Sequence, residues 1–109
     1  MTSLSGSVSV QKVEGIARTF ELQQNYPNPF NPSTAIRYSI PARGHVRLRV
    51  YDLIGRVIAT LVDQEQPAGN YSAVWRGVTD SGLPASSGVY FYRFESSLYS
   101  STRKMLFVK

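Results

Sequence analysis

The chain has 109 residues, which suits one domain that buries roughly two-thirds of the surface exposed by its unfolded state. It contains no cysteine, which excludes a disulfide framework, and no run of about eighteen apolar residues that would form a membrane-spanning helix. Seven Tyr, five Phe and one Trp favour strands, and apolar residues never repeat at helical spacing over three turns.

The formal net charge of +5 comes mostly from arginine, and five arginines fall within twenty residues: Arg37, Arg43, Arg47, Arg49 and Arg56. A basic patch of this kind can contact nucleic acid, lipopolysaccharide phosphates or an acidic partner. No stacking-aromatic pattern of a nucleic-acid module accompanies the arginines, so we expect no nucleic-acid partner. The arginines are instead expected to line the solvent face of an amphipathic hairpin.

Residues 1–16 are predicted to be a linker or lead-in, followed by one domain over residues 17–109. The lead-in is rich in Ser and Gly, and Val8, Val10 and Val13 are too sparse to predict a strand. The next segment, Ala17–Gln24, alternates imperfectly and is predicted to be a first edge strand.

Three prolines within six residues mark the segment Asn25–Ser33, which we call the proline crossing. Proline cannot donate a hydrogen bond to a strand ladder, and it biases the preceding residue towards extended backbone. The proline crossing is therefore predicted to be rigid and to run over the surface, with Tyr26 and Phe30 anchored in the core.

The strongest strand signal is the hairpin His45–Val62, which follows a predicted strand over Thr34–Ile40. Apolar and charged residues alternate in its first arm, which predicts one buried face and one solvent face. In the turn, Asp52 at the first position and Gly55 at the fourth suit a type I turn closed by a left-handed residue. The return arm, Arg56–Val62, is apolar on both faces, which is typical of a strand covered on both sides or lying at a partner surface.

The second half of the chain predicts further strands by the same alternation. Its segments are a polar loop (Asp63–Gly69), a strand (Tyr71–Trp75), an irregular connection (Arg76–Gly88), a strand (Val89–Glu95) and a last strand (Tyr99–Val108). Two aromatic faces are expected, one with Tyr71, Ala73 and Trp75 and the other with Tyr90, Tyr92 and Phe94.

Seven predicted strands with turn signals about every 8–12 residues indicate an all-β fold, a seven-stranded antiparallel β-sandwich. The segment Gly88–Tyr92 resembles a tyrosine corner, with Tyr92 at the place where an antibody domain carries its second cysteine. Aromatic packing is then expected to replace the missing disulfide.

Few polar side chains are placed for catalysis, and we expect no catalytic residue, no metal ligand and no cofactor. His45 is the only histidine, and Asp80 lacks the neighbouring carboxylates that a calcium loop needs. Asp63 and Glu65 lie in a predicted loop without a cleft, unlike the carboxylate pair of a glycosidase. The chain is therefore predicted not to be an enzyme.

Two motifs in the chain, NYPNPFNPST over Asn25–Thr34 and YDLIGR over Tyr51–Arg56, point to a known family. They resemble the C-terminal sorting domain of type IX secretion substrates in Bacteroidetes and their relatives. The resemblance continues through Ala68-Gly69, Trp75, Ser87–Arg93 and Arg103–Met105 to Lys109, and it starts near Phe20. Its motif residues are Pro27, Asn28, Pro29, Phe30, Tyr51, Asp52, Gly55, Arg56, Gly88 and Tyr90. The chain is also similar to the immunoglobulin-like domain of the flagellar hook-capping protein.

The resemblance implies an immunoglobulin-like sandwich that acts as a non-catalytic secretion signal. A passenger protein, often an enzyme or adhesin, would be linked to the N-terminal side of this domain. The domain would pass through the periplasm and be presented to the outer-membrane secretion machinery. A sortase-like peptidase would cut within Met1–Arg18, and the passenger would be released or attached to anionic lipopolysaccharide at the cell surface.

The last strand is the expected contact with that machinery, because Tyr99–Lys109 has a free end at a sheet edge and edge strands invite pairing. Within it, the expected apolar contacts are Met105, Leu106, Phe107 and Val108, and the expected charges are Arg103, Lys104 and Lys109.

Two other functions stay open from the sequence. One is a carbohydrate-binding module of a polysaccharide-degrading enzyme, in which Tyr71, Trp75, Phe91 and Tyr99 would stack on sugar rings. In an aromatic-rich sandwich such residues are more often core. The other is a structural immunoglobulin-like spacer or hook-cap domain, which a continuation of the chain beyond Lys109 would favour.

Overall fold

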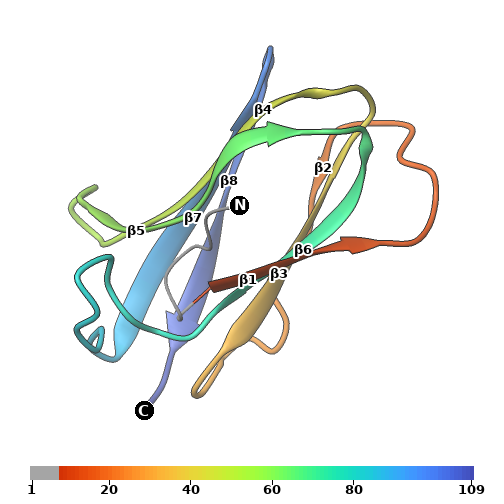
Figure 1. The fold of residues 1–109 in the computed structure, drawn as a ribbon. Helices are drawn as coiled ribbons and strands as arrows, with labels where there is room; N and C mark the ends of the chain where they lie inside the picture. Colours follow the sequence, from red (N-terminus) through yellow and green to blue (C-terminus); the bar gives the residue numbers. More distant parts are fainter. Residues whose placement is uncertain (1–7) are drawn as a thin grey trace.

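Two antiparallel sheets of four strands each form a sandwich in the computed structural model, which describes residues 8–109 (Figure 1). The strands are β1 (Val8–Val13), β2 (Glu21–Leu22), β3 (Thr34–Ile40), β4 (Gly44–Tyr51), β5 (Val57–Gln66), β6 (Gly69–Trp75), β7 (Gly88–Ser96) and β8 (Tyr99–Phe107). One sheet has the order β1-β6-β3-β2 and the other β5-β4-β7-β8. The predicted antiparallel sandwich is confirmed, with eight strands instead of seven. Among these residues no helix is long and apolar enough to cross a membrane.

The additional strand is β1, which lies in the predicted lead-in, so the expectation that its valines form no strand is wrong. β1 pairs antiparallel with β6 over its whole length, from Val8 opposite Trp75 to Val13 opposite Asn70. Pairing of this kind depends on backbone groups more than on apolar content, because β6 offers an otherwise open ladder. The part of the lead-in over residues 1–7 lies outside the described residues, and the domain boundary at residue 17 stays a prediction.

The core lies between the two sheets and is built from alternate residues of each strand. The predicted inward faces are confirmed: the buried residues include Val46, Leu48 and Val50 of β4, Tyr71, Ala73 and Trp75 of β6, and Tyr90, Tyr92 and Phe94 of β7. Aromatic rings cross between the sheets, with ring centroids 5.1 Å apart for Tyr38 and Phe94 and 5.5 Å for Trp75 and Tyr90.

β5 explains why the return arm of the hairpin is apolar on both faces. It is an edge strand, and its register against β4 shifts, so that Val62 faces Leu48 while Thr60 faces Arg49. Leu61 is the extra residue of this bulge, and both Leu61 and Val62 are buried. The apolar residues on both faces of the return arm therefore reflect a bulged edge strand and not a strand covered on both sides. The predicted loop from Asp63 is also wrong, because β5 continues to Gln66.

Tyrosine hydroxyls tie irregular segments to the sheets where an antibody domain has a disulfide. The Tyr90 hydroxyl donates to the Ser86 carbonyl at 2.6 Å, which confirms the tyrosine corner. The Tyr92 hydroxyl donates to the Gln23 carbonyl at 2.7 Å and accepts the Asn25 N–H at 2.8 Å. Tyr92 thus fastens the start of the proline crossing across the sandwich.

Candidate functional site

The proline crossing seals part of the outer edge of β8 through Phe30. The Phe30 N–H donates to the Leu106 carbonyl at 3.0 Å, and the Val108 N–H donates to the Phe30 carbonyl at 3.1 Å. The Phe30 ring is buried and stacks on Phe107, with centroids 4.7 Å apart. Phe30 therefore acts as a one-residue parallel strand beside β8, which confirms it as an anchor of the crossing.

Two side chains extend this contact along β8. The Asn28 Oδ1 accepts the Leu106 N–H at 2.9 Å, and the Gln24 Nε2 donates to the Lys104 carbonyl at 2.7 Å. The backbone groups of β8 that point outward at these positions are thus already hydrogen-bonded within the chain. A partner strand could pair with this part of β8 only after displacing the crossing.

The expectation that Tyr26 is a second anchor is wrong, because its side chain is 81% exposed. The Tyr26 backbone pairs with Ala35 in both directions at 2.9 Å, which turns the ring away from the core. The buried residue at this point is Asn25, whose Nδ2 donates to Thr34 Oγ1 at 2.9 Å and to the Pro27 carbonyl at 3.1 Å.

At the other motif, Asp52 holds the turn between β4 and β5 in a fixed shape. Its Oδ1 accepts the N–H groups of Ile54 at 3.0 Å and Arg56 at 2.9 Å, and its Oδ2 accepts the Arg56 Nε at 2.7 Å. The Arg56 N–H and then its guanidinium hold the pKa of the Asp52 carboxyl below its usual range. Gly55 has a φ of +88° and donates its N–H to the Asp52 carbonyl at 3.1 Å, as predicted.

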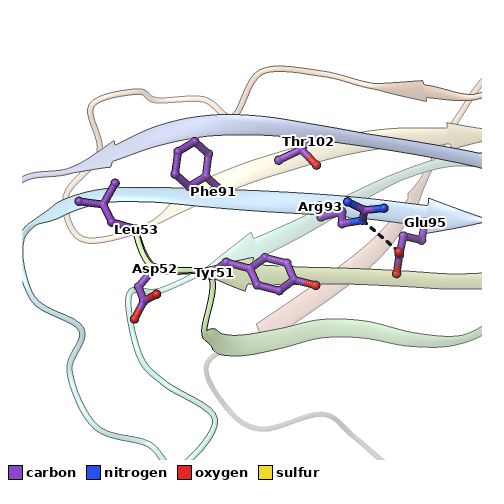
Figure 2. A pocket seen from close by; sticks show the side chains of 8 residues that line it. Tyr51, Asp52, Leu53, Phe91, Arg93, Glu95 and Thr102 are labelled. Atoms are coloured by element: carbon purple, nitrogen blue, oxygen red, sulfur yellow. Dashed lines mark hydrogen bonds and ion pairs between the residues drawn. The ribbon is translucent and has the colours of Figure 1, made fainter.

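Beside this turn the outer face of the β5-β4-β7-β8 sheet carries a hollow of about 460 Å³, which we call the outer-face hollow (Figure 2). The residues that line it are Tyr51, Asp52, Leu53, Gly55, Phe91, Arg93, Glu95 and Thr102. Tyr51 of β4 and Phe91 of β7 are paired across the sheet and place two aromatic rings in it. Leu53 lies in the turn beside the hollow and is 68% exposed.

A second hollow of about 270 Å³ lies on the other side of the same turn, against the start of β7. It is lined by Asp52, Leu53, Ile54, Arg56, Ser87, Gly88, Val89 and Tyr90. The ten motif residues therefore fall into two structural groups. Pro27, Asn28, Pro29 and Phe30 lie in the crossing that covers β8, and Tyr51, Asp52, Gly55, Arg56, Gly88 and Tyr90 line the two hollows.

Three arginines on this outer face share one carboxylate. Glu95 lies 3.0 Å from Arg93 Nε, 3.6 Å from Arg47 Nη1 and 3.9 Å from Arg49 Nη2. The Arg49 guanidinium also sits 5.7 Å from the centre of the Tyr51 ring. Its Nε is buried without a hydrogen-bond partner among the described residues. Arg47 Nε also lies 3.9 Å from Asp63 Oδ1, and the three guanidinium groups still carry more donors than the two carboxylates can accept.

The predicted partner-binding residues of β8 divide by direction. Met105 and Phe107 are buried in the core, while Leu106, Val108, Lys104 and Lys109 are exposed. Arg103 donates from Nε to the Leu22 carbonyl at 2.8 Å, which gives it a structural contact. A partner that meets β8 from outside can therefore reach only the exposed members, and their role in binding stays a prediction.

The residues considered for sugar stacking do not form one exposed platform. Tyr71 and Trp75 are buried, and Tyr99 stacks on Phe20 with centroids 5.0 Å apart. Phe91 alone lies in the outer-face hollow. Of the side chains that might hold an ion, His45 pairs with Asp63 at 2.6 Å, and residues 8–109 contain no group of three or more His, Cys, Asp or Glu suited to a metal.

Sequence reasoning missed Leu53, Arg93, Glu95 and Thr102 as members of one site. A signal was present in the alternation itself. Tyr51 follows the buried Val50, and Phe91 precedes the buried Tyr92, so both rings must lie on the solvent face. What the sequence does not show is that β4 and β7 are neighbours, which pairs Tyr51 with Phe91 and places both in one hollow.

The two antiparallel sheets, the tyrosine corner and the buried tryptophan define an immunoglobulin-like β-sandwich. The family model described as the FlgD Ig-like domain matches residues 33–98, and the chain belongs to this family. The match runs from the end of the proline crossing to the turn before β8.

Among solved structures, the chain is similar to dimeric latent PorU from Porphyromonas gingivalis, with a TM-score of 0.66 and 23% sequence identity. The alignment covers 88% of this chain and 10% of that one, so this chain spans about a tenth of the PorU chain. The likeness supports the β-sandwich fold of this chain. In PorU the matching region is a small part of the whole chain. No curated protein matches the chain.

Proposed function

We propose that this chain is the sorting domain of a type IX secretion substrate, a non-catalytic signal that directs an attached passenger to the cell surface or the medium. The observation that supports this best is the contact between the PNPF motif, Pro27–Phe30, and β8. Phe30 and Asn28 together occupy three backbone groups, two at Leu106 in β8 and one at Val108 directly after it. The two regions that carry the resemblance at opposite ends of the chain thus form one folded surface.

A folded signal agrees with the rest of the molecule. Met105 and Phe107 are core residues, so the end of the chain is not a linear peptide that a receptor could read alone. The fold also occurs as about a tenth of the longer PorU chain, which is consistent with a domain attached to something larger. The passenger would lie on the N-terminal side, and the partners would be the outer-membrane secretion machinery and a sortase-like peptidase.

The expected cleavage region, Met1–Arg18, can be narrowed within the described residues. Peptidases need accessible, extended backbone, and β1 is paired with β6. Between β1 and β2 the chain is outside both strands, and Ile16 is 80% exposed there. We place the cut in this connection, with release or surface attachment of the passenger following it.

The test is export of a reporter. The full chain, Met1–Lys109, is fused to a soluble reporter with a signal peptide in a host that has the type IX apparatus, and reporter in the medium is measured. We expect the fusion to leave the periplasm and the reporter alone to remain there. A fusion that is folded and protease-resistant yet stays in the periplasm would contradict the proposal.

Removing Arg103–Lys109 would not be a clean test of β8. The truncation would take Met105 and Phe107 out of the core and leave Phe30 without its stacking partner. Loss of export would then report unfolding as readily as loss of recognition. Substitution of the exposed Leu106 and Val108 by Ser keeps the core residues. It therefore tests only whether the secretion machinery recognises the exposed side of β8.

The second candidate is a structural immunoglobulin-like spacer or hook-cap domain, and the family match over residues 33–98 favours it. A spacer needs only a stable sandwich between its neighbours. It predicts that the fusion folds but is not exported, which is the outcome opposite to that of the sorting domain. The carbohydrate-binding alternative has lost most of its expected platform, because Tyr71 and Trp75 are buried.

A further inference from the structure

We propose that the outer-face hollow is the docking site for the partner, which would be a protein segment that inserts an apolar anchor side chain beside a carboxylate. This inference rests on the sorting role proposed above and deepens it. It moves the contact from the edge of β8, where the proline crossing already occupies the outward backbone groups, to the face of the sheet.

The outer face of this sheet carries apolar side chains around the hollow. One face of an antiparallel sheet is normally polar where it meets water. Here Tyr51 and Phe91 are cross-strand partners whose side chains both line the hollow, and Leu53 projects from the neighbouring turn (Figure 2). On β8 the cross-strand partner of Phe91 is Lys104, and Leu106 lies at the next outward-facing pair, opposite Val89. An apolar surface around a hollow is the usual form of a site that receives an anchor side chain.

The backbone around the hollow is ordered before any partner binds. Leu53 is in a two-residue tip that Asp52 holds through three hydrogen bonds to Ile54 and Arg56. Tyr51 and Phe91 stand on two central strands, β4 and β7, whose backbones are paired on both sides at these residues. A hollow whose walls are already ordered loses little conformational entropy when a partner binds, which favours affinity.

The arginines beside the hollow set the charge that a partner must carry. Arg47, Arg49 and Arg93 all lie within 3.9 Å of the Glu95 carboxylate, and Arg47 Nε also lies 3.9 Å from Asp63 Oδ1, so three guanidinium groups share two carboxylates. Arg49 Nε has no hydrogen-bond partner among the described residues. A carboxylate on the partner would add acceptors to a cluster that has too few, and arginine beside aromatic rings is typical of protein interfaces. The complementary partner is therefore an acidic segment and not a basic one.

Two other occupants fit less well. A second copy of this chain would place the same arginine cluster against itself across a two-fold contact. An acidic sugar would use the guanidinium groups, but it would need open ring faces, and Tyr51 and Phe91 are each half-buried. An acidic sugar would also leave unused the aliphatic side chain of Leu53, which lines the hollow.

The experiment uses the reporter fusion of the full chain and compares two exposed leucines in hairpin turns. Leu53 lies in the β4–β5 turn at the hollow, and Leu98 lies fully exposed in the β7–β8 turn at the other end of β7. We expect Leu53→Glu to lower exported reporter about tenfold or more, the size of one lost anchor contact, and Leu98→Glu to leave it unchanged. Arg93→Glu should also lower export, whereas Arg37→Glu on the other sheet should not.

Thermal unfolding of each purified fusion shows that the variants are folded. If the unchanged fusion is not exported, the sorting role itself fails. If the unchanged fusion is exported and the Leu53→Glu and Leu98→Glu variants are exported to the same extent, the proposed docking site is wrong while the sorting role stands. Two measurements on the purified chain test the other occupants. One contrary outcome is a dimer in sedimentation that Leu53→Glu abolishes, and the other is binding of polygalacturonate that Arg93→Glu abolishes. Either result would identify another occupant of the hollow and overturn the proposal of an acidic protein segment.

Discussion

At the scale of single residues, two glycines in left-handed backbone differ in what surrounds them. Gly55 has a φ of +88° and no atom within 4 Å of the place a Cβ would take. Gly77 has a φ of +71°, and a Cβ there would lie 2.8 Å from the Phe107 Cζ. The first position therefore requires glycine for backbone conformation alone, and the second requires it for conformation and for space.

We predict that Gly55→Ala lowers the free energy of unfolding by about 1–2 kcal/mol, the usual strain of a left-handed residue with a Cβ. Gly77→Ala should lower it further, because the Phe107 ring stacks on Phe30 with centroids 4.7 Å apart and has little room to move. Urea denaturation of the purified chain and its two variants measures both losses. Equal losses would mean that Phe107 yields freely, contrary to its packing.

At the scale of elements, the proline crossing and the edge of β8 form one unit. Asn28 and Phe30 meet backbone groups of β8, and Tyr92 of β7 fastens the start of the crossing. The crossing thus serves as a cover for an edge strand, which is a usual protection against pairing with other chains. It also makes the stability of β8 depend on a segment nearly eighty residues away, as the separation of 78 between Asn28 and Leu106 shows.

We predict that Phe30→Ala lowers the free energy of unfolding by about 3–5 kcal/mol, the range for removing a large buried aromatic side chain. Tyr26→Ala, in the same crossing, should change it by less than about 0.5 kcal/mol, since that ring is 81% exposed. Urea denaturation of the two variants gives the comparison. A large loss for Tyr26→Ala would show that its ring packs against the domain after all.

These elements also show how far the sequence predicts the fold. β3 was predicted with its observed bounds, and the inward faces of β4, β6 and β7 were predicted correctly, because period-two alternation marks a half-buried strand directly. Phe30 and Tyr26 could not be told apart, since a proline-rich segment has no such period. β1 and the outer-face hollow were missed for a related reason. Both depend on which strands become neighbours, and alternation within a strand does not contain that information.

At the scale of the whole molecule, two buried tyrosines join the sheets to each other and to the crossing. The Tyr38 hydroxyl on β3 donates to Gln66 Oε1 on β5 at 2.8 Å, from one sheet to the other. The Tyr92 hydroxyl on β7 bonds to the backbone of Gln23 and Asn25. Burial raises the pKa of Tyr92 to about 12 and raises that of Tyr38 further, because an ionised phenol would lose its hydration.

The sign of the resulting pH dependence follows from linkage. An unfolded tyrosine ionises at a pKa of about 10, so the folded state binds more protons than the unfolded state above that pH. The stability contributed by neutral Tyr92 is therefore complete below pH 10 and is lost as the pH rises through about 12. We predict that the urea midpoint is nearly constant from about pH 7 to 9 and falls steeply above about pH 10.

Tyr92→Phe should lower the midpoint at neutral pH, because it leaves Gln23 and Asn25 unpaired, and should reduce its fall at high pH. Tyr26→Phe is the matched control at an exposed ring and should follow the unchanged chain throughout. If Tyr92→Phe loses stability with rising pH as steeply as the unchanged chain, the loss of stability at alkaline pH is caused by other groups and not by ionisation of Tyr92.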